Sequence, residues 1–168
     1  PYTAISITAM GELPAGKGLT RAGARVGDDV WVSGTPGDAF AALGQIFGYW
    51  TFAEPLFGYF RSRMDLPEPR VTLGRGLLNV ATACCDISDG LVGDLKHILE
   101  RSGVSARLFW PAFPKSDAME LLPEAVSSAV FCPAEMITNC FLPHLLIAAR
   151  KSNKLQSVRE LVCPALAR

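Results

Sequence analysis

The residues most capable of chemistry in this chain lie in one short segment, 86–91. It holds two carboxylates, Asp86 and Asp89, with the hydroxyl of Ser88 between them. An apolar run, residues 77–85, precedes the segment and predicts a buried strand, and apolar residues at helical spacing follow it. Oxygen ligands at such a turn can hold Mg²⁺ or a metal-bound phosphate near the positive end of the helix dipole.

Helix capping is the simpler interpretation of the same segment. Asp and Ser are preferred N-cap residues, and a cap contributes roughly 1 kcal/mol without any ligand. An EF-hand loop fits poorly, because Gly90 and Leu91 stand where that motif has an acidic or amide residue and a glycine. The spacing of the residues leaves capping and metal binding both open.

A basic stripe beside a glycine-rich loop is a second candidate site. Lys17, Arg21 and Arg25 follow the loop 11–18 at intervals of four residues. If this piece is helical, the three cations share one side and could bind phosphate. A charged face that is simply solvated is the alternative interpretation.

The elements that position these groups are expected to be short. Val30–Val32 is a predicted strand that runs through the glycine loop Gly34–Asp38 into a helix over residues 39–47. The loop has neither the lysine of a Walker motif nor the glycine spacing of a dinucleotide site. The helix that follows Gly90 is expected to end at Ser102–Gly103.

Three further stretches complete the predicted architecture. Tyr2–Ala9 and Val104–Phe109 alternate as strands do, and the aromatic-rich stretch Gly48–Arg63 is expected to be helix and core. Strands and helices intermix without a strict βαβ rhythm. The fold class is therefore predicted to be α/β, as an α+β sandwich of a mixed sheet and helices.

Composition limits the classes of function. With 168 residues and 49% hydrophobic content, the chain suits one domain, or one and a fraction. Sixteen basic and sixteen acidic residues cancel, so net charge favours neither nucleic acid nor a membrane as partner. Five cysteines, with Cys84 next to Cys85, form no disulfide framework and no CxxC zinc motif, which fits reduced thiols in the cytoplasm.

Four groups of residues, in order along the chain, resemble the thiamine-monophosphate kinases of the aminoimidazole-ribonucleotide-synthetase superfamily. They are Gly18–Ala24 with Gly27 and Asp28, Val32–Asp38, Pro69–Val71, and Asp86–Leu91 with Asp94 and Leu95. The resemblance implies the fold of the superfamily's C-terminal domain. Four such motifs in sequence are far more specific than one.

The resemblance also implies an activity. In that family ATP donates its γ-phosphate to thiamine monophosphate, giving thiamine diphosphate, with magnesium between the two anions. Asp86 and Asp89 look like magnesium ligands, Ser88 like a contact to a nucleotide phosphate, and Arg21 like the cation that meets the nucleotide. The implied partners are these two small molecules, with no nucleic acid and no membrane.

The resemblance divides the chain into three parts. Residues 1–10 are expected to be the last strand of the family's N-terminal domain, and residues 11–129 the C-terminal-like domain. The N-terminal domain forms the family's homodimer and supplies most of its magnesium-binding aspartates. The resemblance places the rest of that domain before residue 1, so we expect little turnover from this chain alone.

Residues 130–168 depart from the family. Where the family has Gly-Gly-Asp-Asp-Tyr-Glu-Leu, this chain has Pro133–Cys140. Read from the third base of each codon, Met136 and Ile137 must give Asp, Asn139 and Cys140 must give Leu, and the other junctions permit the rest of the heptad. This tail is therefore expected to be a frameshifted, partly disordered segment, in which the apolar stretch 141–149 could still form a helix.

Two other readings remain. One is a decayed, non-catalytic fragment that folds and associates through the surface that a lost domain would cover. The other is a sister enzyme of the superfamily, such as selenophosphate synthetase. The sequences of Thr35–Asp38 and Asp86–Leu91 favour the thiamine enzyme over the other enzymes of the superfamily.

Overall fold

One four-stranded sheet organises the computed structural model, which describes residues 2–131, 142–149 and 162–165. The sheet order is β2-β3-β1-β4, and each of its strand pairs is antiparallel. The strands are β1 (Asp29–Ser33), β2 (Ala83–Ile87), β3 (Leu142–Ala149) and β4 (Val162–Ala165). Pro164 lies in β4, at the edge of the sheet, where a residue without a backbone donor is tolerated.

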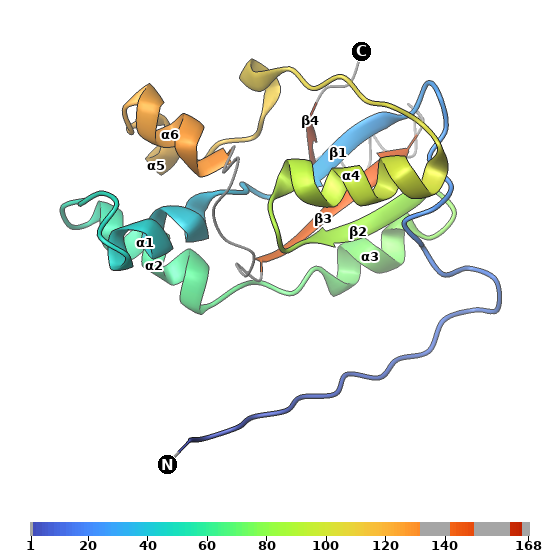
Figure 1. The fold of residues 1–168 in the computed structure, drawn as a ribbon. Coiled ribbons are helices and arrows are strands. Elements are labelled where there is room, and N and C mark those ends of the chain that lie inside the picture. The colour runs from blue at the N-terminus through green and yellow to red at the C-terminus, as the bar shows by residue number, and fades with distance from the viewer. Residues whose placement is uncertain (1, 132–141, 150–161, 166–168) are drawn as a thin grey trace.

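Helices lie on both faces of the sheet and beyond one of its ends. Figure 1 shows α4 on one face and α3 on the other, with α1, α2, α5 and α6 gathered past the end of β1. The helices are α1 (Asp38–Ile46), α2 (Leu56–Asp65), α3 (Val71–Leu77), α4 (Leu91–Ser102), α5 (Asp117–Glu120) and α6 (Glu124–Phe131), with a short 3₁₀ turn at Trp110–Ala112. No helix in the described ranges is both long enough and apolar enough to cross a membrane.

The two faces of the sheet pack into separate cores because alternate residues of a strand point to opposite sides. The larger core takes alternate residues of β1 and β2 and the apolar side of α4, and it extends to α1 and α2; these strand and α4 residues are Val30, Val32, Ala83, Cys85, Ile87, Leu91, Leu95 and Ile98. Trp31 packs on the opposite face with Leu73 and Leu77 of α3. Burial on both faces therefore fixes β1 inside the molecule, whereas β2 lies at the edge of the sheet and leaves Asp86 exposed.

Several predicted elements are confirmed. The strand Val30–Val32 lies within β1, and the helix predicted at 39–47 is α1. The predicted end of the next helix is also confirmed, because Gly103 closes α4 in a left-handed conformation with φ 65°. The aromatic stretch contains α2 and packs into the core, as in the T-shaped contact of Trp50 with Phe40 of α1 at 5.9 Å between ring centroids.

The predicted mixed sheet is not seen among the described strands. β1 and β2 run in the same direction, as alternate strands of an antiparallel sheet do. Strand β3 lies between them and runs antiparallel to both. The two parallel strands are thus never neighbours.

Two predicted strands are wrong in position or type. The apolar run 77–85 is not one strand, because Leu77 ends α3 and Asn79 turns the chain with φ 74° before β2 begins. Val104–Phe109 is not a strand either, although half-buried and exposed residues alternate along it. Its half-buried side chains pack against the larger core, so the alternation reflects burial on one side without strand pairing.

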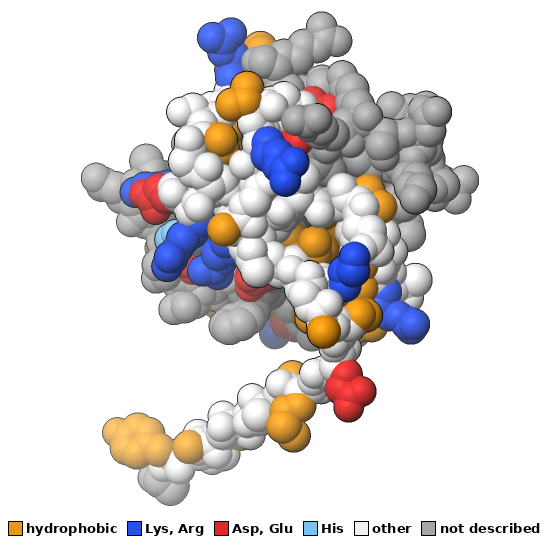
Figure 2. Space-filling view, turned by 90° about the vertical axis from the view of Figure 1, so that its right-hand side faces the viewer, with side chains coloured by type: hydrophobic (Ala, Val, Ile, Leu, Met, Phe, Trp, Pro, Cys, Tyr) orange, Lys and Arg blue, Asp and Glu red, His pale blue; other side chains and the backbone are white. Residues whose placement is uncertain are grey.

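The amino-terminal residues differ from their predicted local structure. Tyr2–Ala9 is extended but pairs with no described strand, and it projects from the body in Figures 1 and 2. Its assignment to a strand of a preceding domain stays a prediction. The segment that carries Lys17, Arg21 and Arg25 is a loop, not a helix, because Gly16 and Gly23 turn it at φ 71° and 125°.

The tail gives one clear correction. Residues 142–149 form β3 and not a helix, since this apolar run finds two strand neighbours, β1 and β2, on its two sides. Residues 132–141, 150–161 and 166–168 lie outside the described part of the chain. The proposed domain limits at 11–129 and 130–168, and the frameshift, stay predictions.

Candidate functional site

Three of the four candidate residues lie where β2 leads into α4, with Asp86 in the strand and Ser88 and Asp89 in the turn. Ile87 ends the strand and Leu91 begins the helix, and each is 3% exposed, so the turn is pinned to the core at both ends. Between these anchors, Ser88 is half-buried and Asp89 is exposed. Gly90 allows the sharp reversal with φ 105°, a conformation that L side chains rarely adopt.

The side chain of Asp94, in the first turn of α4, holds the turn between β2 and α4 in place. Its carboxylate is buried, and one oxygen accepts hydrogen bonds from the backbone N–H groups of Ser88 (2.8 Å) and Asp89 (2.9 Å). A charged acceptor for two backbone donors is a strong local restraint. The turn is therefore held by a side chain of α4 and not by its own polar side chains.

The capping interpretation of this segment is wrong. The N-cap of α4 is Gly90, and no side-chain hydrogen bond caps the helix. No hydrogen bond or ion pair joins the side chain of Asp86, Ser88 or Asp89 to another residue in the described ranges. Asp86 and Asp89 are both exposed, so their carboxylates are available to a ligand.

The donor set of this turn fits magnesium. Its available ligands are carboxylate and hydroxyl oxygens, which a hard divalent cation prefers. Within the described residues, no cluster of three or more His, Cys, Asp or Glu could enclose a metal. Mg²⁺ is usually held by one or two carboxylates, with water and substrate phosphates completing its coordination, so two aspartates suffice.

Arg21 lies apart from the other candidates. Its carbonyl accepts from Ser102 Oγ (3.3 Å), which also accepts from the N–H groups of Gly23 (3.2 Å) and Ala24 (3.1 Å). Ser102 is the last residue of α4, whereas Ser88 precedes its first turn. Since α4 has 12 residues, its two ends lie about 18 Å apart.

The loop around Arg21 nevertheless runs beside β2. The N–H of Cys84 donates to the carbonyl of Thr20 at 2.9 Å, two residues before Asp86 in the strand. The exposed Arg21 side chain forms no ion pair with Asp86 or Asp89. The structure thus places Asp86 near the end of β2, Ser88 and Asp89 in the turn that follows, and Arg21 on a neighbouring segment.

The cysteines of β2 are not nucleophiles. Burial, together with the nearby charge of Asp86, raises the pKa of Cys84 to about 11. Burial likewise raises the pKa of Cys85 to about 12. Both thiols stay protonated near neutral pH, which excludes thiolate chemistry at this strand.

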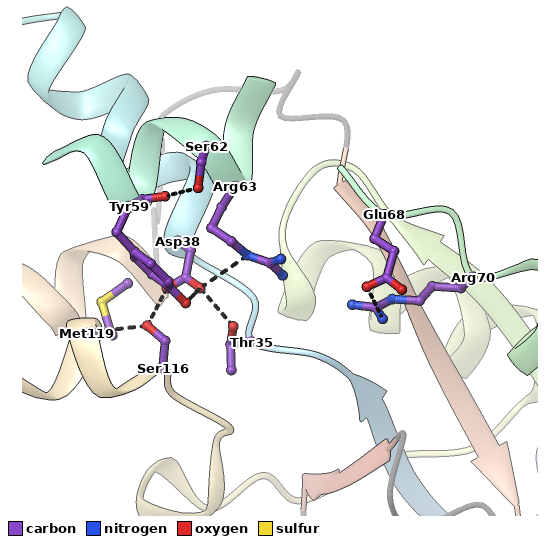
Figure 3. A network of polar contacts seen from close by, with 9 residues as sticks. All are labelled: Thr35, Asp38, Tyr59, Ser62, Arg63, Glu68, Arg70, Ser116 and Met119. Carbon is purple, nitrogen blue, oxygen red and sulfur yellow. Dashed lines mark hydrogen bonds and ion pairs between the residues drawn. The ribbon is translucent and has the colours of Figure 1, made fainter. Parts of the chain in front are cut away.

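A second polar centre surrounds Asp38, the first residue of α1 (Figure 3). Its carboxylate is 2% exposed and accepts from Thr35 Oγ1 (2.7 Å), Ser116 Oγ (2.7 Å) and the Tyr59 hydroxyl (3.2 Å). The Nε of Arg63 lies 3.8 Å away. Asp38 therefore links the glycine loop to α2 and to the start of α5.

Electrostatics distinguish Asp38 from an exposed aspartate. Burial raises its pKa, and this effect outweighs the hydrogen bonds from Ser116, Thr35 and Tyr59 and the charge of Arg63, which lower it. Burial also raises the pKa of Tyr59, and the charge of Asp38 adds to the increase. The cluster is a tightly satisfied structural centre without a free carboxylate oxygen.

Reasoning from sequence missed both buried aspartates as organising residues. Asp94 had a local signal, since an acid in the first turn of a helix can reach back to the preceding backbone. Asp38 had a similar signal at the start of α1. The partners of Asp38 had none, because Ser116 follows it by 78 residues.

Comparison with known proteins bears on the family, although no family model matches the chain. The chain is 43% identical over 110 residues to the thiamine-monophosphate kinase of Salmonella typhimurium, covering 65% of this chain and 34% of that enzyme. The Escherichia coli O157:H7 enzyme is 36% identical over 134 residues, covering 78% of this chain and 41% of that enzyme. The chain is homologous to a portion of the thiamine-monophosphate kinases. It spans 34% of the Salmonella typhimurium enzyme and 35% of the Haemophilus influenzae enzyme, about a third of each, which fits a C-terminal portion.

Solved structures agree with this relationship. The thiamine-monophosphate kinase of Stenotrophomonas maltophilia has a TM-score of 0.78 at 32% identity, covering 93% of this chain and 51% of that one. The Aquifex aeolicus enzyme has a TM-score of 0.70 at 28% identity, covering 89% and 49%. The hydrogenase maturation protein HypE of E. coli, at 17% identity and a TM-score of 0.56, shares the fold alone, covering 94% and 49%. The resemblance to the thiamine-monophosphate kinases is thereby confirmed.

Proposed function

We propose that this chain is part of an enzyme that transfers a phosphoryl group from ATP to thiamine monophosphate, giving thiamine diphosphate. One observation carries the proposal: the turn 86–90 presents two carboxylates and a hydroxyl without described partners, in a homologue of thiamine-monophosphate kinases. A solved relative named "AaThiL complexed with AMPPCP and TMP" has a TM-score of 0.67 at 28% identity, covering 89% of this chain and 47% of that one. Because AMPPCP is an ATP analogue, that complex supports two small-molecule substrates.

Asp86 and Asp89 are the residues proposed to hold magnesium. When bound, the ion would neutralise charge on the phosphate oxygens that must approach one another. Exposed carboxylates leave room for those phosphates beside the ion. Asp94 supports this arrangement, since it fixes the backbone from which Ser88 and Asp89 project.

The remaining candidate residues are assigned to the nucleotide. The hydroxyl of Ser88 is free to donate to a phosphate oxygen, whereas its backbone N–H is already used by Asp94. Arg21 would meet a part of the nucleotide away from Ser88, because the two lie toward opposite ends of α4. Phosphoryl transfer of this kind needs positioning and charge stabilisation, and no protein nucleophile.

The whole enzyme requires more than this chain. The relatives are about three times longer than the matched region, so we propose that a further domain completes the site and forms a homodimer. We also propose that the enzyme acts in the cytoplasm, in keeping with the free thiols of Cys84 and Cys85. Neither nucleic acid nor a membrane is proposed as partner.

Complementation tests the proposal directly. The chain would be co-expressed with the preceding part of the Salmonella typhimurium enzyme, and thiamine diphosphate formation would be followed by chromatography. We expect product from the pair, and a fall of about 10² to 10³ in rate for Asp86→Asn, because several kcal/mol of transition-state stabilisation are lost.

Glu100→Gln is the matched control for that experiment. Glu100 is an exposed acid on α4 whose partner, Lys96, lies one turn away on the same helix. Its removal should leave the rate unchanged. A folded pair that forms no product, or an Asp86→Asn variant as active as Glu100→Gln, would contradict the proposed function.

A further inference from the structure

Two arginines converge beside the Asp38 centre. Arg63 lies on α2, and Arg70 precedes the first residue of α3. Their side chains are only 28% and 15% exposed. In Figure 3 the two guanidinium groups point toward one another across the space between their backbones. Two half-buried cations that face each other repel unless an anion lies between them.

The partners of these arginines leave much of their donor capacity unused. Arg63 reaches Asp38 only through Nε, at 3.8 Å, which is beyond hydrogen-bond distance. Arg70 Nη1 donates to Glu68 at 3.1 Å, and the Glu68 side chain is 70% exposed. The Nε atoms of both arginines are buried and have no hydrogen-bond partner. A buried donor without an acceptor is unfavourable, so the Nε–H group of each arginine is a donor that still lacks its acceptor.

The acidic groups beside the arginines do not supply that acceptor. Asp38 is engaged by three hydroxyl donors, and burial raises its pKa, which weakens it as a counter-charge. Glu68 contacts one edge of Arg70 from a solvent-exposed position. These two carboxylates therefore leave N–H donors of both guanidinium groups without an acceptor.

We propose that Arg63 and Arg70 together bind a phosphate group. Guanidinium presents paired N–H donors that match the oxygens of a tetrahedral phosphate, and two such groups facing each other can share one anion. This inference goes beyond the proposed function, because it concerns residues outside the turn 86–90 and requires no turnover. The phosphate could be free or part of a phosphorylated small molecule, since the recognised chemistry is the same.

Nuclear magnetic resonance tests the site on the full 168-residue chain. The Nε–Hε resonances of Arg63 and Arg70 would be followed while sodium phosphate is added, against sodium chloride at equal ionic strength. We expect saturable shifts of both resonances with phosphate only. Arg63→Lys and Arg70→Lys, which keep the charge but lose the paired donors, should each weaken binding by about tenfold.

Arg61→Lys is the control, because Arg61 lies on the same helix but is 48% exposed and already paired with Asp65. It should bind phosphate as the unchanged chain does. Further titrations with thiamine monophosphate and with ATP would show which phosphorylated molecule competes with inorganic phosphate for the same two resonances. If neither thiamine monophosphate nor ATP competes with inorganic phosphate, the site is assigned to free phosphate.

The proposal is overturned if phosphate moves the two resonances no more than chloride does, or if Arg61→Lys weakens binding as much as Arg70→Lys. If one Lys variant is unfolded, as shown by loss of the dispersed spectrum, the phosphate titration of the other Lys variant tests the site. If both variants unfold, the titration of the unchanged chain decides alone. None of these outcomes depends on kinase activity, so the site and the proposed function can fail separately.

Discussion

Two strand-to-helix turns in this molecule use a buried aspartate in opposite ways. One turn joins β1 to α1 and contains Asp38, and the other joins β2 to α4 and is held by Asp94. Each carboxylate is 2% exposed. Asp38 binds side-chain hydroxyls, whereas Asp94 binds backbone N–H groups. Two equally buried aspartates therefore stabilise different things: Asp94 holds the backbone of one turn, and Asp38 holds side chains from separate elements together.

The range of the contacts explains the difference. Asp94 reaches back only five and six residues, so the β2–α4 turn is self-contained. Asp38 reaches 21 residues to Tyr59 and 78 residues to Ser116, so it connects distant parts of the fold. A turn that is held locally can present its remaining polar side chains to a ligand. A turn that is tied into the core by its carboxylate cannot.

Asp38→Ala should have the largest effect on stability. It removes the acceptor of three hydroxyl donors and leaves Arg63 without its counter-charge. We expect a loss of about 3 kcal/mol in the free energy of unfolding, measured by urea denaturation. Asp65→Ala, which removes a 45%-exposed carboxylate on α2, should cost less than about 1 kcal/mol. Equal losses would contradict the central role of Asp38.

Asp94→Ala should have the next largest effect. Two backbone N–H groups, those of Ser88 and Asp89, lose their acceptor, and we expect a loss of about 2 kcal/mol. Hydrogen exchange at these two amides should accelerate more than at the amides of α1, because the restraint is local. Asp94→Asn keeps one acceptor oxygen and should lose less. Uniform acceleration across the chain would show that Asp94, like Asp38, supports the whole fold.

Local patterns predicted this second turn well. The limits of α4 follow from an amphipathic run that begins after Gly90 and ends at Gly103. The three polar residues that the turn presents lie within four positions of one another, so no long-range information was needed to group them. The same locality explains why α1 and β1 could be predicted.

Contacts between distant segments could not be predicted in this way. The run 142–149 is apolar enough for a helix or a buried strand, and only its pairing with β1 and β2 makes it a strand. Val104–Phe109 shows the reverse case, since its alternation arises from packing without a neighbouring strand. Tertiary packing also determines which residues contact Asp38 and how the side chains of Arg63 and Arg70 come to point toward one another.

The pH dependence of stability should report on the buried carboxylate of Asp38. Burial raises the pKa of Asp38 above its ordinary value of 3.8, so the folded state keeps this proton to a higher pH than the unfolded chain does. Its contribution is most favourable below pH 3.8 and is lost as pH rises from there through the folded-state pKa.

Asp38→Asn does not titrate and tests this directly. Its stability relative to the unchanged chain should therefore rise across that interval and then level off, in urea titrations at several pH values. A relative stability that stays constant or falls with pH would mean that the folded state favours the ionised carboxylate.

The exposed aspartates should have the smallest effect on folding. Asp86→Asn and Asp89→Asn remove carboxylates that have no described protein partner, so the free energy of unfolding should change by less than about 0.5 kcal/mol. Magnesium should raise the Tm of the unchanged chain, because an ion that binds only the folded state stabilises that state. It should raise the Tm of either variant less. Glu100→Gln should respond to magnesium as the unchanged chain does. If the two Asn variants are instead as destabilised as Asp94→Ala, then Asp86 and Asp89 help to hold the turn. In that case the buried aspartate does not differ from the exposed aspartates in supporting the turn, and the proposed contrast is wrong.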